Sequence, residues 1–156
     1  MYQVTAGSVE EFFRFDPARE DDLRALDALI RAAAPSLPRW LFPGTPPGQP
    51  GMTITMIGYG RFEYPIQSSP TPISWPILGL ALQKNYISRY SGAQAGGPPF
   101  TRAYAGKLGR ARVSGTGVVT FAGVGDVDVA ALAGMITAIE AGLADGRLTP
   151  RAKDRP

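Results

Sequence analysis

The sequence predicts a single α+β domain in which helices at both ends of the chain pack on an antiparallel sheet. Three observations predict it. Apolar residues recur at helical spacing in residues 17–34 and again in residues 129–143. Between residues 53 and 121 lie short segments with the β-branched and aromatic content of strands. The chain of 156 residues also suits one domain, because two halves would be too small to bury stable cores.

The N-terminal helices are expected to begin at two caps. Ser8, followed three residues later by Glu11, forms a capping box that opens a short helix to about residue 15. Asp16 and Pro17 then supply an N-cap and a first helical residue. The helix that follows has acids in its first turn, where the helix dipole favours them, and is expected to end near residue 34, before two prolines.

The middle of the chain predicts about five strands joined by turns and loops. The expected strands are residues 53–57, 61–67, 76–82, 86–90 and 117–121. Gly58-Tyr59-Gly60 is expected to form a tight hairpin turn, and Lys84-Asn85 a second one. Residues 42–51 and 68–73, both rich in proline, are expected to be loops.

The last third of the chain predicts one short and one long helix. Residues 101–108 suit a short helix that ends at Gly109, and Asp126-Val127-Asp128 caps a final helix that ends near Gly146. The domain is therefore expected to span residues 1–146. Residues 147–156 form a polar tail bounded by proline, which we expect to be poorly packed.

The absence of cysteine and histidine excludes many kinds of chemistry. Without cysteine, the chain has no disulfide, no thiolate nucleophile and no cysteine-ligated metal site. Without histidine, catalysis of the Ser-His-Asp type and the common zinc and non-haem iron ligand sets are excluded within one chain. The only acid in the strand region is Glu63, so a catalytic carboxylate pair is not indicated either. We assign no catalytic residue. A mechanism based on Lys84 or a tyrosine stays open, but no motif calls for one, and the sequence favours a protein that is not an enzyme.

Charge and hydropathy indicate which ligands and which cellular location to expect. The net charge is +3, with −2 in residues 1–50 and +5 in the remainder. This asymmetry suits an anionic ligand, but the excess is too small to predict nucleic-acid binding. No apolar run is long enough to cross a bilayer, and the first ten residues lack the features of a secretory signal. We therefore expect a soluble, cytoplasmic protein that is not bound to membranes.

Three stretches of the sequence carry a resemblance to a known family. They are Met56 to Gly60 with Tyr64; Trp75-Pro76 with the block Ala81 to Tyr90; and Lys107 to Arg110 with Phe121 and Asp126 to Asp128. In order and spacing, residues 8–144 resemble the YdhG-like family, a domain of unknown function. The resemblance implies an antiparallel sheet with helices packed against it. One branch of the family is treated as a frataxin-like intracellular iron chaperone, so the resemblance also raises iron as a cofactor.

The chain departs from the family pattern at three positions. Thr116 and Val118 stand where relatives commonly have lysine and cysteine, which puts any ligand or redox role of those two residues in doubt here. Arg110 stands where lysine is more usual, which keeps the charge but changes the donor geometry.

A group of aromatic and basic residues gives the candidate binding site. The aromatic members are Tyr59, Tyr64, Trp75, Tyr86 and Tyr90, and the basic members are Lys84, Lys107 and Arg110. One interpretation is that the rings cover one sheet face and close the core, with the bases solvated around them. The other is that the rings form a concave surface for a small anionic or aromatic ligand, with the bases as a cationic rim.

Three hypotheses for function follow. The first is a non-enzymatic domain that binds a small ligand at this aromatic and basic site. The second is a frataxin-like iron chaperone with carboxylate ligands, for which Glu20, Asp21 and Asp22, together with Glu10, are the candidates. The same three acids also suit a helix start, where they complement the dipole. The third is a protein–protein interaction module that acts through a homodimer or a partner, with exposed aromatic residues as the interface.

Overall fold

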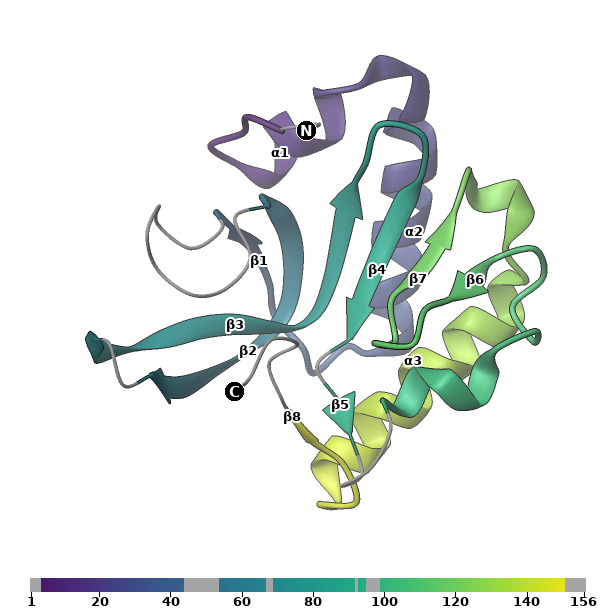
Figure 1. Cartoon of the computed structure of the whole chain (residues 1–156). Helices are drawn as coiled ribbons and strands as arrows, with labels where there is room; N and C mark the ends of the chain where they lie inside the picture. Colours follow the sequence, from purple (N-terminus) through teal and green to yellow (C-terminus); the bar gives the residue numbers. More distant parts are fainter. Residues whose placement is uncertain (1–3, 44–53, 67–68, 92, 95–98, 151–156) are drawn as a thin grey trace.

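The computed structural model describes residues 4–43, 54–66, 69–91, 93–94 and 99–150, and these form a mixed α+β fold (Figure 1). The helices of the described part are α1 (Val9–Arg14), α2 (Glu20–Ala33) and α3 (Val129–Ala144). Three short 3-10 helices, η1 (Pro17–Arg19), η2 (Phe100–Tyr104) and η3 (Val124–Asp126), connect other elements. None of the described helices is long and apolar enough to cross a membrane.

A six-stranded antiparallel sheet forms the centre of the fold. Its strands, in spatial order, are β1 (Arg39–Phe42), β2 (Met56–Ile66), β3 (Ser69–Leu82), β4 (Ile87–Ser91), β7 (Val119–Phe121) and β6 (Arg112–Val113). A separate two-stranded ribbon pairs β5 (Ala93–Gln94) with β8 (Thr149–Pro150). The α+β class predicted from the sequence is confirmed, with six strands in the main sheet where about five were expected.

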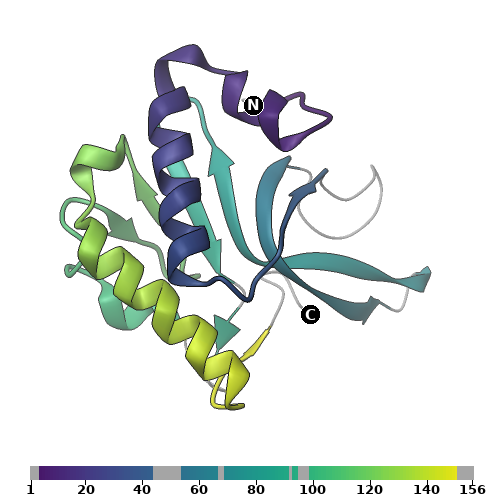
Figure 2. The ribbon, with the colours of Figure 1, turned by 180° about the vertical axis from the view of Figure 1, so that it is seen from behind.

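Helices α2 and α3 lie on the same face of the sheet, as the views from both sides show (Figures 1 and 2). The apolar stripe of α2 is buried there, with Leu23, Leu26 and Ile30 at most 1% exposed. From the sheet side, Ile57, Leu78, Leu80 and Leu82 face the helices. The main hydrophobic core lies in this layer between the helices and the sheet. Burial of such apolar side chains is the dominant favourable contribution to folding.

A second, smaller apolar cluster lies on the opposite face of the sheet. It contains Phe42, Met56, Trp75 and Ala81, all at most 3% exposed. The rings of Phe42 and Trp75 are 5.6 Å apart between centroids. Side chains alternate along β2, so Met56 belongs to this cluster while its neighbour Ile57 faces the helices.

The hairpin turn predicted at Gly58-Tyr59-Gly60 is wrong, because β2 continues without interruption through these residues. Gly58 is required for another reason: a Cβ there would lie 2.7 Å from Nε1 of the Trp40 indole, which packs across the strand. Gly60 has a φ of +74°, which favours glycine within the strand. The expected loop at residues 68–73 is also wrong from residue 69 on, since Ser69–Leu82 is strand β3; residue 68 and the tip of this hairpin lie outside the described residues.

Several local predictions are confirmed. Ser8 caps α1, and its Oγ accepts a hydrogen bond of 3.1 Å from the backbone nitrogen of Glu11. Asp128 caps α3, as predicted. Asp16 caps the short helix η1 instead of the long helix, which starts later, at Glu20, after Arg19 without a side-chain capping bond. The predicted pairing of residues 76–82 with 86–90 is the β3–β4 hairpin, in which Leu82 pairs with Ile87 and the turn is closed by a hydrogen bond from Gln83 to Tyr86.

Elsewhere the predicted boundaries shift. The expected helix at residues 101–108 is the 3-10 helix η2. Phe42, where a loop was expected to begin, is the last residue of β1, and residues 44–51 lie outside the described residues. The first part of the expected tail is packed: Leu148 is 4% exposed, and Thr149 and Pro150 pair with β5. Residues 151–156 lie outside the described residues.

Candidate anion-binding groove

An open groove of about 660 Å³ lies where α2 ends and the chain turns into β1. Its lining residues are Ala28, Arg31, Ala32, Pro35, Leu37, Pro38 and Arg39. They come from the last two turns of α2, from the connection that follows and from the first residue of β1. The groove is therefore built almost entirely from one continuous segment, residues 28–39.

Hydrogen bonds to two other elements hold the connection between α2 and β1 in place. From α3, the Glu140 carboxylate accepts a bond of 2.8 Å from the backbone nitrogen of Ser36 and a second from its hydroxyl. The Thr137 hydroxyl of α3 donates to the carbonyl of Ala33 at 2.9 Å. From β2, the backbone nitrogen of Gly60 donates to the carbonyl of Pro38 at 2.8 Å. A groove fixed in this way is preorganised, which reduces the ordering cost of binding.

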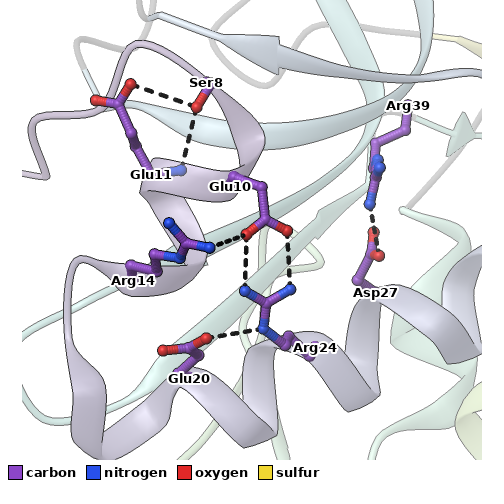
Figure 3. Close-up of polar contacts among 8 residues, drawn as sticks. All are labelled: Ser8, Glu10, Glu11, Arg14, Glu20, Arg24, Asp27 and Arg39. Carbon is purple, nitrogen blue, oxygen red and sulfur yellow. Dashed lines mark hydrogen bonds and ion pairs between the residues drawn. The ribbon is translucent and has the colours of Figure 1, made fainter.

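Behind the groove, a buried carboxylate joins the helix to the sheet. Asp27, on the core-facing side of α2, is 5% exposed. Its Oδ1 accepts a hydrogen bond of 2.8 Å from the hydroxyl of Tyr59 on β2. Its Oδ2 accepts a bond of 2.7 Å from Nη1 of Arg39 on β1 (Figure 3). A buried charge is tolerated when it is paired and hydrogen-bonded, and both oxygens of Asp27 meet this condition.

Burial of Tyr59 keeps its hydroxyl protonated. The ring is fully buried, and this desolvation, followed by the negative charge of Asp27, raises the pKa of Tyr59 far above its usual value. The phenol is therefore a permanent donor to the carboxylate over the physiological pH range.

Two guanidinium groups border the groove on the outer side of this carboxylate. The side chain of Arg39 is 30% exposed, and that of Arg31 is 56% exposed. Nη1 of Arg31 lies 3.7 Å from Oδ2 of Asp27, an ion pair without a hydrogen bond. Within the described residues, Arg31 makes no hydrogen bond and Arg39 uses only Nη1, so most of their N–H donors remain open to a ligand. Guanidinium groups bind carboxylates and phosphates through paired N–H donors, so this arrangement suits an anion.

The aromatic residues predicted to share one site are divided between the two faces of the sheet. Tyr59 lies in the main core under α2, whereas Trp75 lies in the second cluster beside Phe42. Both are at most 3% exposed, so neither offers a ring to a ligand at the surface. The side chains of Tyr64 and Tyr90 lie outside the described residues, although their backbones pair within the sheet.

The remaining members of the predicted site are exposed but belong to two separate turns. Lys84 and Tyr86 lie on the β3–β4 turn, where Tyr86 is 43% exposed. Lys107 and Arg110 lie between η2 and β6, and Arg110 pairs with Asp126 at 3.6 Å. The predicted aromatic and basic surface is thus not brought together as one site by the described residues.

The acids considered as iron ligands are mostly engaged in other contacts. Nη1 and Nη2 of Arg24 donate to the two oxygens of Glu10 at 3.0 and 2.8 Å, and its Nε donates to Glu20 at 2.9 Å (Figure 3). Asp22 accepts a hydrogen bond from the backbone nitrogen of Val124 at 3.2 Å. Among the residues that the structure describes, no group of three acidic side chains is placed to hold a metal ion.

Sequence reasoning overlooked the three charged residues that define the groove, Asp27, Arg31 and Arg39. One signal was present: Asp27 falls within the apolar stripe of its helix, four residues after Leu23 and three before Ile30. A charged residue is rarely buried unless it is paired. An aspartate on a core-facing stripe therefore predicts a hydrogen-bond donor or a positive charge beside it in the fold. The partner Arg39 is 12 residues away, and nothing in the sequence pattern identifies it.

The fold and the groove together define the class of protein as a small α+β domain with a preorganised groove that presents two arginines. No family model matches the chain, and neither the curated proteins nor the solved structures contain a match to it. Membership of the YdhG-like family therefore stays a prediction.

Proposed function

We propose that this domain binds a small anion in the groove between α2 and β1, without catalysing a reaction. One observation carries the proposal: two guanidinium groups, Arg31 and Arg39, border a groove and share a single buried carboxylate. Of the donors of these two arginines, Asp27 accepts a hydrogen bond only from Nη1 of Arg39, and the nearby Glu140 carboxylate is engaged by Ser36, so neither carboxylate covers the remaining guanidinium donors. An anionic ligand would use these open N–H donors.

The chemistry of the lining residues favours binding over catalysis. A guanidinium is always protonated in proteins, so neither arginine can act as a general base. The other lining residues are alanine, proline and leucine, which have no reactive side chains. The carboxylate of Asp27 is buried and already accepts bonds from Tyr59 and Arg39, so it is not presented to a ligand.

The proposal keeps the ligand class expected from the sequence and changes its location. A small anionic ligand remains the expectation, but the groove replaces the surface around Trp75 and Lys84. Membership of the YdhG-like family is part of the proposal, supported by the motifs quoted above and by the antiparallel α+β fold. A cytoplasmic location is also part of the proposal, since a chain without cysteine needs no oxidising compartment to form disulfides.

The test is an NMR titration of ¹⁵N-labelled protein at low ionic strength with acetate, hexanoate and inorganic phosphate, each in turn. At least one of these anions is expected to give saturable shifts that centre on the amides of residues 27–39. Replacing Arg31→Gln removes charge-assisted hydrogen bonds, which contribute about 1.5–3 kcal/mol, so affinity should fall by about 10-fold or more. The fold should survive, because Arg31 is largely exposed.

A matched control separates site binding from general charge attraction. Arg112 on β6 is exposed and makes no ion pair within the described residues, so Arg112→Gln changes the net charge equally. Binding should be unaffected in this variant. Equal losses in both variants, or shifts that never saturate with any of the three anions, would contradict a specific site.

A further inference from the structure

Apart from the two arginines, the groove has a wall of small apolar residues. Ala28 and Ala32 are one helical turn apart on α2 and form an exposed strip of small apolar side chains. Pro35, Leu37 and Pro38 continue this apolar surface along the connection to β1. A bare inorganic anion would contact only the arginines and would leave this wall in water.

Two carboxylates already lie beside the groove. Asp27 pairs with both arginines, and the Glu140 carboxylate is bound to Ser36 in the connection between α2 and β1, so the four charges sum to zero. Each negative charge on a ligand adds to these two carboxylates, so a monoanion is favoured over a dianion. Asp27 is 5% exposed, and its Oδ2 is already shared by both guanidinium groups at 2.7 and 3.7 Å. A second negative charge next to a buried carboxylate is unfavourable, because interactions between charges are strengthened where water is excluded.

From these two features we infer that the ligand is an apolar monocarboxylate, with its carboxylate on Arg31 and Arg39 and its hydrocarbon part along Ala28, Ala32 and the two prolines. This inference rests on the proposed function, since it names the ligand class of the same groove. The groove volume of about 660 Å³ lies within the range of small-molecule sites. Planar carboxylates also match the paired donors of a guanidinium.

The experiment is isothermal titration calorimetry of the full chain with four ligands at constant ionic strength: acetate, hexanoate, hexanamide and hexyl phosphate. Each methylene placed against one apolar wall should contribute about a factor of two, half the free energy of complete burial, so hexanoate, with four more methylenes, should bind about 16-fold more tightly than acetate. Hexanamide, which lacks the charge, should bind at least 10-fold more weakly than hexanoate. Hexyl phosphate is mostly a dianion at about pH 8, because its second pKa is near 6, and it should bind more weakly than hexanoate.

A variant of the apolar wall tests the placement of the hydrocarbon. Ala32→Gln puts a polar side chain on the strip, so the advantage of hexanoate over acetate should fall from about 16-fold to less than about 3-fold. Ala25→Gln is the matched control, because Ala25 is exposed on the same helix but does not line the groove. It should leave the advantage unchanged.

The outcomes distinguish this inference from the function on which it rests. If acetate and hexanoate bind equally, or hexyl phosphate binds more tightly than hexanoate, the inference is overturned while anion binding at the groove stands. If none of the ligands binds, and inorganic phosphate also fails to bind, both the inference and the proposed function are overturned.

Discussion

Removing the carboxylate of Asp27 should destabilise the fold more than removing the hydroxyl that bonds to it. In Tyr59→Phe, Asp27 loses one of two hydrogen-bond donors but keeps Arg39. A hydrogen bond to a charged group contributes about 1.5–3 kcal/mol, and the lower end applies because the carboxylate stays paired. In Asp27→Ala, the buried hydroxyl of Tyr59 loses its acceptor, at a cost of about 1–3 kcal/mol. The partly exposed Arg39 also loses its ion pair, worth about 1 kcal/mol.

These contributions predict a loss of about 1.5 kcal/mol for Tyr59→Phe and about 3 kcal/mol for Asp27→Ala. The double variant should be no less stable than Asp27→Ala alone, because phenylalanine leaves no hydroxyl without a partner. The expected coupling energy is therefore about 1.5–2 kcal/mol, within the range for residues in direct contact. The measurement is equilibrium unfolding in urea followed by far-UV circular dichroism, with linear extrapolation to water.

Tyr104→Phe is the matched control for loss of a hydroxyl. Tyr104 packs against Phe100, and its hydroxyl makes no hydrogen bond within the described residues, so its stability should change by less than about 0.5 kcal/mol. A double variant whose loss equals the sum of the two single losses would refute the reasoning, because it would show that the two side chains do not interact.

Three further predictions follow from the structure. Burial raises the pKa of Tyr59 in the folded state, so the stability contributed by its protonated hydroxyl is complete below the unfolded pKa of about 10 and is lost progressively above it. At about pH 11 the wild type should have lost about 1.4 kcal/mol more stability than Tyr59→Phe, as measured by urea unfolding at each pH. The hydrogen bonds from Arg24 lower the pKa of Glu10, so an NMR titration should find it below the usual value for glutamate and find a rise in Arg24→Gln; a pKa unchanged by the substitution would contradict the contact. Gly117 has a φ of +86°, and a Cβ there would lie 2.6 Å from Oγ1 of Thr101. Gly117→Ala should therefore destabilise the fold by at least about 2 kcal/mol. Gly115→Ala is the control: with no atom within 4 Å of the new Cβ, it should change stability by less than about 1 kcal/mol.

The helices could be predicted from the sequence because their signals are local. The caps at Ser8 and Asp128 lie next to the helices that they open, and both are found as caps in the structure, whereas Asp16 caps the 3-10 helix η1 and not α2. The β3–β4 hairpin was predicted for a similar reason, since an apolar run, a short polar turn and a second strand follow directly in the chain.

The turn at Gly58-Tyr59-Gly60 was predicted wrongly because the role of these glycines depends on a distant contact. Gly58 admits the ring of Trp40, which lies 18 positions earlier in the chain and on another strand. Glycine in a strand marks either a bend or a close approach, and the sequence pattern does not distinguish the two. The short strands β1 and β6, of four and two residues, carry too few positions for a period of two to be recognised.

The candidate groove was not predictable, because it depends on which face each residue occupies. Tyr59 was singled out as a ligand-binding ring, but its position on β2 directs it to the core, where Asp27 accepts its hydrogen bond. Arg39 reaches Asp27 only because β1 pairs with β2 at the edge of the sheet. Pairing of strands across the sheet sets these positions, and a single sequence does not reveal it.

The apolar cluster on the face away from the helices gives the protein an internal reporter. Both tryptophans of the chain, Trp40 and Trp75, belong to or pack against this cluster. Their fluorescence therefore monitors one side of the sheet, while circular dichroism at helical wavelengths monitors the other. Coincident unfolding curves from the two signals would mean that both sides melt as one cooperative unit. A fluorescence change at lower urea would mean that the side away from the helices opens first, while α2 and the groove remain folded.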